Sequence, residues 1–443
     1  MKRIINIITL LVLFNNILHA EKATDISDYR FRHYSIEEGI PSNCITSIIQ
    51  DSKGYIWIGT DMGLCKFNGT DFITLGYEKN DSILRKKTIT SIFEKGNHIL
   101  LGTEYGIYEY NNSTQTTKEL ELITQDNKKY SPIVNHITSD INGNLWIATG
   151  KDGIFMYSET NNTAIQYQIP DTHLPLLRVL TDSNNNIWAT GMDNLYKLNK
   201  TTNKFEVFKI EGYEHGIYSM AILEDSNGNI WIGTWNDGLL KVNTINHTTE
   251  TFLSPNNDSQ GIIHIHSITQ TDTNTIYIGS DNGLTIFNTD SGSNYTLNCS
   301  NSAVGSLSDR FIYPITKDKE GGIWIGTYYN GINYLPPFTS QFKGYDEGRQ
   351  NNEFFTGKII SRFIEDDSGN LWIGSDDGGL SLYSQSEDKF INFKNRQSLE
   401  KLNIHAFCID NENLWIGTYS DGIKILNTKN WTVSNLTNNN LYD

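Results

Sequence analysis

Cysteine and proline are scarce in this chain of 443 residues, which contains only 4 Cys and 8 Pro. Cys44, Cys65, Cys299 and Cys408 are far apart, with no C-x-x-C pair and no Cys/His cluster at metal-ligand spacing. This distribution excludes a disulfide framework and argues against a zinc site. We expect the cysteines to be small buried residues, with a single bridge left open.

Basic residues are outnumbered by acidic ones. The chain has 35 Lys and Arg against 51 Asp and Glu, for a net charge of −16. This balance argues against nucleic acid or an anionic membrane as the main partner, because both attract basic surfaces. The simplest interpretation is that the charge keeps the protein soluble. The 37% hydrophobic and 12% aromatic residues are enough to form a core and exclude global disorder.

Long apolar runs are absent after the first twenty residues. Lys2 and Arg3 precede an apolar run over residues 4–18, and a small-residue cleavage pattern ends at Ala20. This order is typical of a secretory signal peptide, here predicted over residues 1–20. No later stretch is long enough to span a bilayer, so we predict a periplasmic protein with no membrane segment in its mature chain.

A repeated unit of the form D-x-x-G-x-[IL]-W-I-G-T is the dominant feature of the sequence. The unit places Trp, or Leu and Tyr in two degenerate copies, at intervals of 42 to 48 residues. The positions are Trp57, Leu100, Trp146, Trp188, Trp231, Tyr277, Trp324, Trp372 and Trp415. Seven of the nine Trp of the chain therefore occupy one repeat position, for which we expect a structural role.

Each unit contains four short apolar segments separated by turn residues, without helical periodicity. In the first copy, Asp51-x-x-Gly54 has the composition of a tight turn, and Gly63 ends another. Four short strands in every repeat of this length are typical of a propeller blade. We therefore predict an all-β fold in which the repeated Trp packs between neighbouring four-stranded antiparallel blades.

Nine repeats exceed the usual number of blades in one ring. The longest interval, between Trp324 and Trp372, contains Pro336-Pro337 and a polar stretch. We predict a seven-bladed propeller over residues 29–337 and a partial second propeller of about two blades over 338–443. The segment 29–34 resembles an outer strand without a blade of its own, and we expect it to complete the seventh blade and close the ring.

The segment from Gly39 to Gly69, with its Asp51-x-x-Gly54 turn and Trp57-Ile-Gly-Thr60 strand, resembles the two-component regulator propeller repeat. The resemblance extends over about residues 29–443. It implies the periplasmic sensor region of a Bacteroides-type hybrid two-component system, in which propellers precede a membrane helix and a histidine kinase. Such sensors commonly detect oligosaccharides, and the resemblance also suggests a homodimer.

The chain departs from that family pattern because it contains no kinase, receiver or DNA-binding part. We expect a truncated sensor whose full-length relative is anchored in the inner membrane, or else a free-standing propeller. Two other functions stay open: a secreted propeller for protein interaction or adhesion, and a propeller lyase or hydrolase. No catalytic set, cofactor motif or metal-ligand spacing stands out from the repeat background, so we expect no enzyme activity and no cofactor.

Ligand recognition is expected where the repeats differ. The loops between second and third strands and those leading into first strands should share one face of the ring. Aromatic rings with a few polar groups suit a sugar, whose C–H faces stack on rings while its hydroxyls form hydrogen bonds. Trp235 is the first choice, because no repeat rule requires a Trp there. The full set of candidates is Trp235, Tyr328, Tyr329, Tyr105, Arg178, His266 and Tyr313.

Overall fold

The computed structural model describes residues 29–76, 83–169, 174–213, 216–255, 262, 264–299, 306–337, 356–387, 389–393, 398–399 and 401–436. The predicted signal peptide lies outside the described residues, as do all of the linker residues 338–355. The described residues fall into two compact units, one ending at Pro337 and the other beginning at Thr356. The two units are described separately below.

The first unit consists of seven four-stranded antiparallel sheets, here called blades 1 to 7. Blades 1 to 3 comprise β2 (Ile45–Gln50), β3 (Ile56–Thr60), β4 (Gly63–Phe67) and β5 (Phe72–Thr74); β6 (Ile89–Lys95), β7 (His98–Thr103), β8 (Gly106–Asn111) and β9 (Thr116–Leu120); and β12 (Val134–Ser139), β13 (Leu145–Thr149), β14 (Ile154–Ser158) and β15 (Thr163–Tyr167). Blades 4 and 5 comprise β16 (Leu176–Thr181), β17 (Ile187–Gly191), β18 (Leu195–Asn199) and β19 (Lys204–Val207); and β20 (Ser219–Glu224), β21 (Ile230–Thr234), β22 (Leu239–Val242) and β23 (Thr249–Phe252). Blades 6 and 7 comprise β24 (Ser267–Asp272), β25 (Thr275–Ser280), β26 (Gly283–Asn288) and β27 (Asn294–Leu297); and β28 (Ile312–Lys317), β29 (Ile323–Thr327), β30 (Ile332–Leu335) and β1 (Arg32–Tyr34). A short 3₁₀ helix, η2 (Ile36–Glu38), and a hairpin of β10 (Leu122–Ile123) and β11 (Lys129–Tyr130) lie outside the blades.

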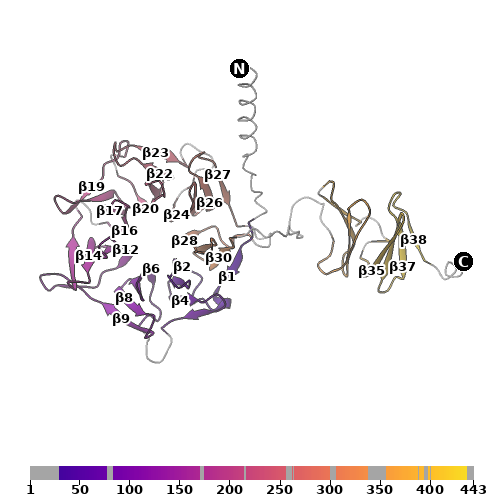
Figure 1. Ribbon diagram of the computed structural model, residues 1–443, viewed down its shortest axis with the longest axis horizontal. Coiled ribbons are helices and arrows are strands. Elements are labelled where there is room, and N and C mark those ends of the chain that lie inside the picture. The colour runs from indigo at the N-terminus through magenta and orange to yellow at the C-terminus, as the bar shows by residue number, and fades with distance from the viewer. Residues whose placement is uncertain are drawn as a thin grey trace, which may run out of the picture. The chain divides into compact units, whose positions relative to one another are not determined.

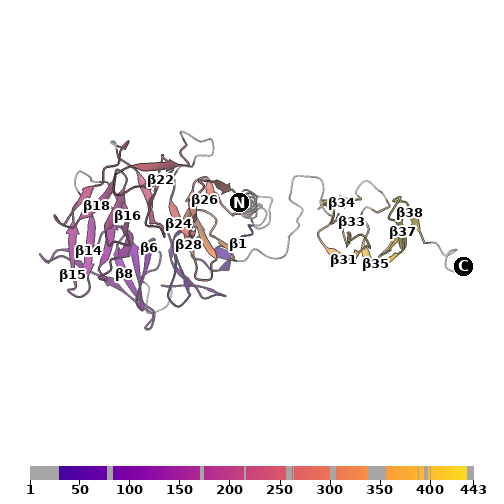
Figure 2. The same cartoon turned by 45° about the horizontal axis from the view of Figure 1, so that its top comes forward.

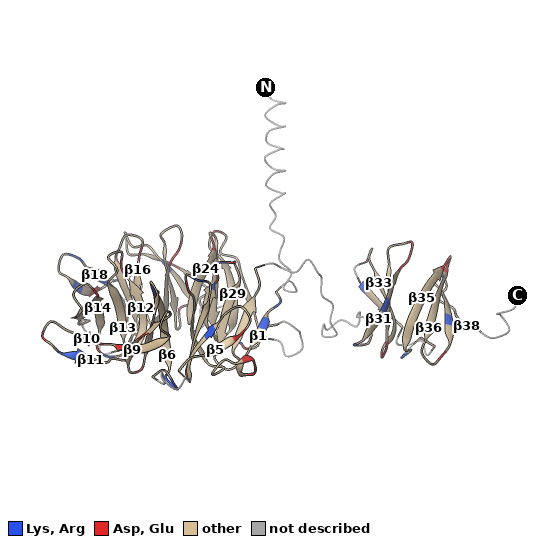
Figure 3. Ribbon diagram, turned by 60° about the horizontal axis from the view of Figure 1, so that its bottom comes forward, with Lys and Arg blue, Asp and Glu red and all other residues tan. Residues whose placement is uncertain are grey.

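The blades form a closed ring with the first strand of each blade nearest the centre (Figure 1). Each first strand contacts the first strand of the next blade, and β28 of blade 7 contacts β2 of blade 1. The tilted view keeps the same order, with β15 at the periphery and β16 inside it (Figure 2). Lys, Arg, Asp and Glu colour mainly the loops and strand ends of the ribbon, while most of its strand positions are other residues (Figure 3). The ring thus buries its apolar residues between blades.

Strand β1 is the outer strand of blade 7 although it lies at the other end of the unit's sequence. It pairs antiparallel with β30, with Tyr34 opposite Ile332. The Tyr34 ring stacks on Trp324 at 6.0 Å between centroids and lies 5.1 Å from the Phe72 ring of blade 1. Tyr34 therefore contacts both blades that meet where the ring closes.

The repeated Trp has a hydrogen bond as well as a packing role. In six repeats its indole Nε1–H donates to the turn Asp six residues earlier, at 2.8 to 3.1 Å, as in Asp225 and Trp231. Each Trp also packs in a cluster with the following blade; Trp231, for example, contacts the cluster of Ile265 and Phe287. Packing between blades was predicted, whereas the hydrogen bond to Asp was not.

The second unit contains two more four-stranded sheets of the same kind. They comprise β31 (Ile360–Glu365), β32 (Leu371–Ser375), β33 (Gly379–Ser384) and β34 (Lys389–Asn392), and β35 (Ile404–Asp410), β36 (Asn413–Thr418), β37 (Ile423–Asn427) and β38 (Val433–Asn435). Trp372 packs on Leu414 and Ile416 of the second sheet, but Trp415 is only partly buried. The predicted fold class, a seven-bladed propeller followed by the first blades of another, is confirmed.

The cysteines differ from the sequence expectation. Cys65 is buried, but Cys299 and Cys408 are exposed and Cys44 is partly so, and all four are free. Burial raises the pKa of the Cys65 thiol to about 12, because an apolar environment disfavours the thiolate. The expectation of buried cysteines therefore holds fully for Cys65 alone.

Candidate ligand-binding site

The two loop classes predicted to share a face do meet in blades 5 to 7. The Trp235 N–H, after β21, donates to the carbonyl of Tyr218 before β20, at 2.9 Å. The His264 N–H, before β24, donates in turn to the Trp235 carbonyl at 2.8 Å, and the Tyr328 N–H donates to the Phe311 carbonyl at 3.1 Å. One backbone hydrogen bond therefore joins the loops of blades 5 and 6, and the other two order the loops within blades 5 and 7.

These loops bring seven rings into a continuous series, here called the aromatic arc. Its members are Tyr218, Trp235, His264, His266, Tyr313, Tyr328 and Tyr329. Successive ring centroids lie 5.0 Å apart for Tyr218 and Trp235, 3.8 Å for Trp235 and His264, 4.1 Å for His266 and Tyr313, 5.2 Å for Tyr313 and Tyr328, and 4.7 Å for Tyr328 and Tyr329. Trp235 also meets His266 edge to face at 6.2 Å.

Trp235, the first-choice sugar platform, is enclosed by protein rings. Tyr218 stacks on it at an interplanar angle of 8°, and His264 stacks on it at 26°. Two neighbouring rings therefore stack on the indole, and Trp235 is only partly exposed.

Tyr328 and Tyr329 are the exposed end of the arc, at 40% and 60% relative exposure. Asp309 orders their loop, since its carboxylate accepts the Tyr329 N–H at 3.0 Å and the Phe311 N–H at 3.2 Å. The Phe311 ring meets Tyr329 edge to face at 5.8 Å. Two tyrosine rings are thus held in fixed loops with surface available for stacking.

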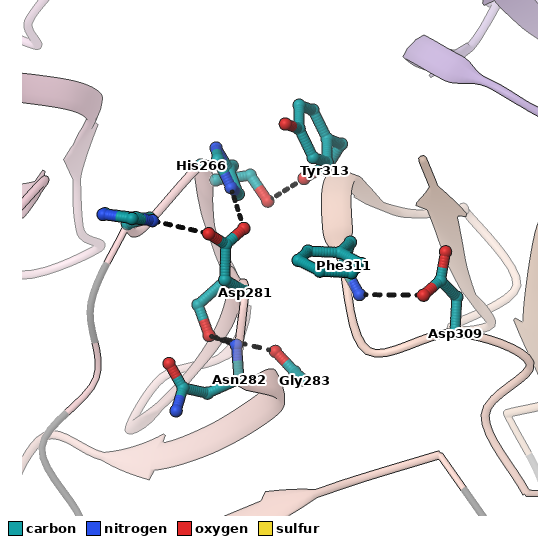
Figure 4. A network of polar contacts seen from close by, with 10 residues as sticks. His266, Asp281, Asn282, Gly283, Asp309, Phe311 and Tyr313 are labelled. Carbon is teal, nitrogen blue, oxygen red and sulfur yellow. Dashed lines mark hydrogen bonds and ion pairs between the residues drawn. The ribbon is translucent and has the colours of Figure 1, made fainter. Parts of the chain in front are cut away.

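A carboxylate shared by two histidines lies in the middle of the arc (Figure 4). Asp281 follows β25 directly and accepts from His264 Nδ1 at 2.5 Å and from His266 Nε2 at 2.8 Å. Burial by itself would raise the pKa of Asp281, but the hydrogen bonds from His266 and His264 outweigh it and lower that pKa. Burial lowers the pKa of His266, against the opposing effect of Asp281.

Five of the seven sequence candidates belong to the arc: Trp235, His266, Tyr313, Tyr328 and Tyr329. Tyr105 lies apart in blade 2, where it is 60% exposed and Lys87 Nζ sits 4.9 Å from its ring centroid. Arg178 lies on β16, the inner strand of blade 4, and is partly buried. The structure therefore does not place Tyr105 with the other candidates.

Sequence reasoning missed Asp281 and His264. Asp281 directly follows the degenerate segment Tyr277-Ile-Gly-Ser280, the same repeat position that Trp235 and Tyr328 occupy in their blades. His264 precedes His266 by two residues, and a His-x-His pattern next to an Asp-bearing loop was the available signal. Within the described ranges, no group of three or more His, Cys, Asp or Glu has the arrangement of a metal site.

The fold and this face together define a β-propeller with one aromatic, partly polar sector. Residues 39–62, 213–236 and 306–329 match the family "Two component regulator propeller". These three segments therefore match the two-component regulator propeller repeat, as the sequence predicted. No curated protein matches the chain.

Solved structures share this architecture. The extracellular domain of hybrid two-component system BT3049 from B. thetaiotaomicron is 25% identical with a TM-score of 0.66, covering 92% of this chain and 54% of that one. The corresponding domain of BT4673 from the same organism is 19% identical with a TM-score of 0.58, covering 92% and 53%. Streptogramin B lyase, at 15% identity and a TM-score of 0.54, covers 69% and 97%. The chain thus spans about half the length of the sensor domains it resembles.

The architecture is therefore that of the extracellular domains of two-component sensors. In the part of the chain that the structure describes, no helix has the length and apolar character needed to cross a membrane.

Proposed function

We propose that the first unit is a ligand-sensing propeller that binds an oligosaccharide on the aromatic arc, within the periplasmic region of a hybrid two-component sensor. The observation that supports this most directly is the exposed pair Tyr328 and Tyr329 beside the polar group of Asp281, His264 and His266. The histidine kinase would belong to a part of the sensor outside this chain. Export by residues 1–20, the inner-membrane anchor of a full-length relative and a homodimer remain predictions.

The chemistry of the arc suits a sugar better than a purely apolar ligand. The exposed tyrosine rings offer faces for C–H stacking and hydroxyls for hydrogen bonds. Asp281 adds carboxylate oxygens that accept hydrogen bonds, already oriented by two histidines. A few polar groups fixed among aromatic side chains are typical of sites that orient a small ligand.

The same polar group gives the enzyme alternative its only specific support, because a carboxylate that orients histidines occurs in general acid–base catalysis. The adhesion alternative has no comparable feature in the described residues. Turnover of an oligosaccharide on incubation, detected by chromatography, would favour a lyase or hydrolase. Binding without turnover favours a sensor.

The test is calorimetric titration of the full chain with a panel of plant and host oligosaccharides. The variant with both Tyr328→Ala and Tyr329→Ala should bind the best ligand about 5- to 150-fold more weakly, since two aromatic contacts of roughly 0.5–1.5 kcal/mol each are lost. Tyr419→Ala is the matched control, because Tyr419 occupies the same repeat position in the second unit and is 80% exposed. Equal loss in both variants, or no loss in the double variant, would refute the arc as the binding site.

Trp235→Ala gives a second measurement on the same ligand. Because Tyr218 and His264 both stack on Trp235, its removal should act by releasing His264 and so disordering Asp281. Unchanged oligosaccharide affinity in this variant would remove Trp235 from the site.

A further inference from the structure

The boundary between blades 4 and 5 breaks the packing rule of the repeat. At the position two residues after the repeated Trp, which is Gly59 in blade 1, eight repeats have Gly or Ala, and blade 4 has Thr190. At the apolar position equivalent to Ile45, the first residue of β2 in blade 1, eight repeats have Ile, Val or Leu, and blade 5 has Ser219. In blade 1 a Cβ on the equivalent Gly59 would lie 2.9 Å from the Ile89 side chain of the next blade. A Gly–Ile contact is therefore replaced by two hydroxyls at this boundary alone.

Arg178 lies directly opposite Thr190 in the ladder of β16 and β17. Its Nη1 donates to the carbonyl of its own neighbour Leu177 at 3.0 Å, and no Asp or Glu pairs with it in the described residues. Burial lowers the pKa of Arg178, as expected for a cation moved out of water. An incompletely hydrated guanidinium without a counter-charge is unfavourable, so this site favours the arrival of an anion.

Buried polar atoms on blades 4 and 5 and on the loop before β24 are also short of partners. Thr190 Oγ1, Ser219 Oγ and His266 Nδ1 are buried and have no hydrogen-bond partner in the described structure. His266 is 5% exposed, and its other ring nitrogen is bound to Asp281. Arg178 lies on β16, which contacts β12 of blade 3 and β20 of blade 5, and its charge contributes, behind burial and His264, to the lowered pKa of His266 in the arc.

We propose that Arg178, together with Thr190, Ser219 and His266, recognises the anionic group of an acidic oligosaccharide, a carboxylate or a sulfate. This inference rests on the proposed function and narrows its ligand class. The guanidinium fork matches the oxygens of a carboxylate or sulfate bidentately. A hydroxyl of the same sugar can donate to His266 Nδ1, while its ring reaches the exposed tyrosines of the arc.

The experiment compares three probes on the full chain by calorimetry. They are an oligosaccharide containing glucuronic acid, the same compound with its carboxyl reduced to the alcohol, and an oligosaccharide without uronic acid that carries a sulfate. Wild type should bind the uronate or the sulfated probe at least 10-fold more tightly than the reduced one. The stronger of the two identifies the source of the anion. Arg178→Gln should remove this preference, while Arg178→Lys, which keeps the charge but not the fork, should retain part of it.

The chain offers a matched control in Arg362. It occupies the same repeat position in β31 of the second unit, where its Nη1 likewise donates to the preceding carbonyl, at 2.7 Å from Ser361, but it is exposed. Arg362→Gln should leave all three affinities unchanged. The thermal midpoint of each variant shows that it is folded, and binding of the reduced probe by Arg178→Gln shows that the arc is intact.

The outcomes separate the two proposals. Equal affinity for the reduced and acidic probes, or an unchanged preference in Arg178→Gln, overturns the role of Arg178 and leaves an oligosaccharide sensor standing. An equal loss of preference in Arg362→Gln also overturns it. Failure of every probe and of the wider panel to bind overturns the proposed function and the acidic ligand together.

Discussion

Removing the carboxylate of Asp225 tests the claim that the repeated turn and the repeated Trp are one structural unit. Asp225 Oδ2 accepts from Trp231 Nε1 at 2.8 Å. Asp225 Oδ1 accepts the backbone N–H of Asn227 at 2.9 Å and of Asn229 at 2.8 Å. Asp225→Ala therefore loses the indole bond and both bonds that shape the turn.

The expected cost follows from which groups can find water afterwards. Trp231 is fully buried, so its N–H is left without an acceptor, at a cost of about 1–3 kcal/mol. The turn amides lie nearer the surface and regain hydration, so their bonds to a charged acceptor add only about 1–2 kcal/mol. We expect a loss of roughly 3 kcal/mol in the free energy of unfolding, and a fall of about 6 °C in the thermal midpoint at roughly 2 °C per kcal/mol for a large domain.

Denaturant unfolding followed by tryptophan fluorescence measures this loss. The control is Thr271→Ala, at the same repeat position of blade 6, where Tyr277 replaces Trp; Thr271 makes only a long bond to the Thr275 carbonyl, at 3.4 Å. It should cost less than about 1 kcal/mol. If Asp225→Ala is no more destabilising than Thr271→Ala, the turn and the Trp are independent and the reasoning fails.

The same unit should respond to acid. Burial would raise the pKa of Asp225, but the bonds from Trp231 and Asn229 outweigh it and lower that pKa. A carboxyl with a lowered pKa in the folded state stabilises above its unfolded pKa and loses that contribution as the pH falls through the folded value. The difference between wild type and Asp225→Ala should therefore shrink at low pH.

Two further predictions concern a glycine of β3 and a histidine of β12. Gly59→Ala should lower the free energy of unfolding by about 1–3 kcal/mol, because its Cβ would lie 3.0 Å from the Ile89 carbonyl oxygen. Gly150→Ala is the control: its Cβ would lie 3.3 Å from the Cβ of a half-exposed Ile133, so it should cost distinctly less in the same unfolding titration. Burial lowers the pKa of His136 to about 3. Between about pH 6.5 and 3 the unfolded chain therefore binds a proton at His136 that the folded chain does not. The free energy of unfolding should fall over this range as the pH drops, by up to about 1.4 kcal/mol per pH unit. His136→Gln should flatten that slope, and an unchanged slope would contradict the burial of a neutral His136.

The architecture could be predicted because its determinants are local and periodic. The Asp-x-x-Gly turn, the alternating strands and the recurring Trp each act within about ten residues, and every copy supports the same interpretation. The degenerate copies at Leu100 and Tyr277 show the limit of the rule: both still pack against the next blade, although neither has an indole to donate to the turn. Trp415 shows another limit, because it has the repeat sequence but is only partly buried.

The candidate site was only partly predictable because it depends on which loops become neighbours. Loop position alone put Tyr105 and Tyr328 in one class, but they belong to blades 2 and 7. That protein rings stack on Trp235 depends on Tyr218 and His264, which its own segment does not reveal. The role of Asp281 depends on His264 and His266, which lie in the connection before β24 and hydrogen-bond to its carboxylate.

The sequence by itself determined the repeat, the strand content and the residues that form the framework, since local turn chemistry and periodic burial depend on nearby residues. Only the tertiary structure decided the pairing of β1 with β30, the joining of rings into an arc and the position of Arg178 without a counter-charge. Those features depend on closing a ring over some three hundred residues. Closure brings together side chains whose sequence separation carries no local signal.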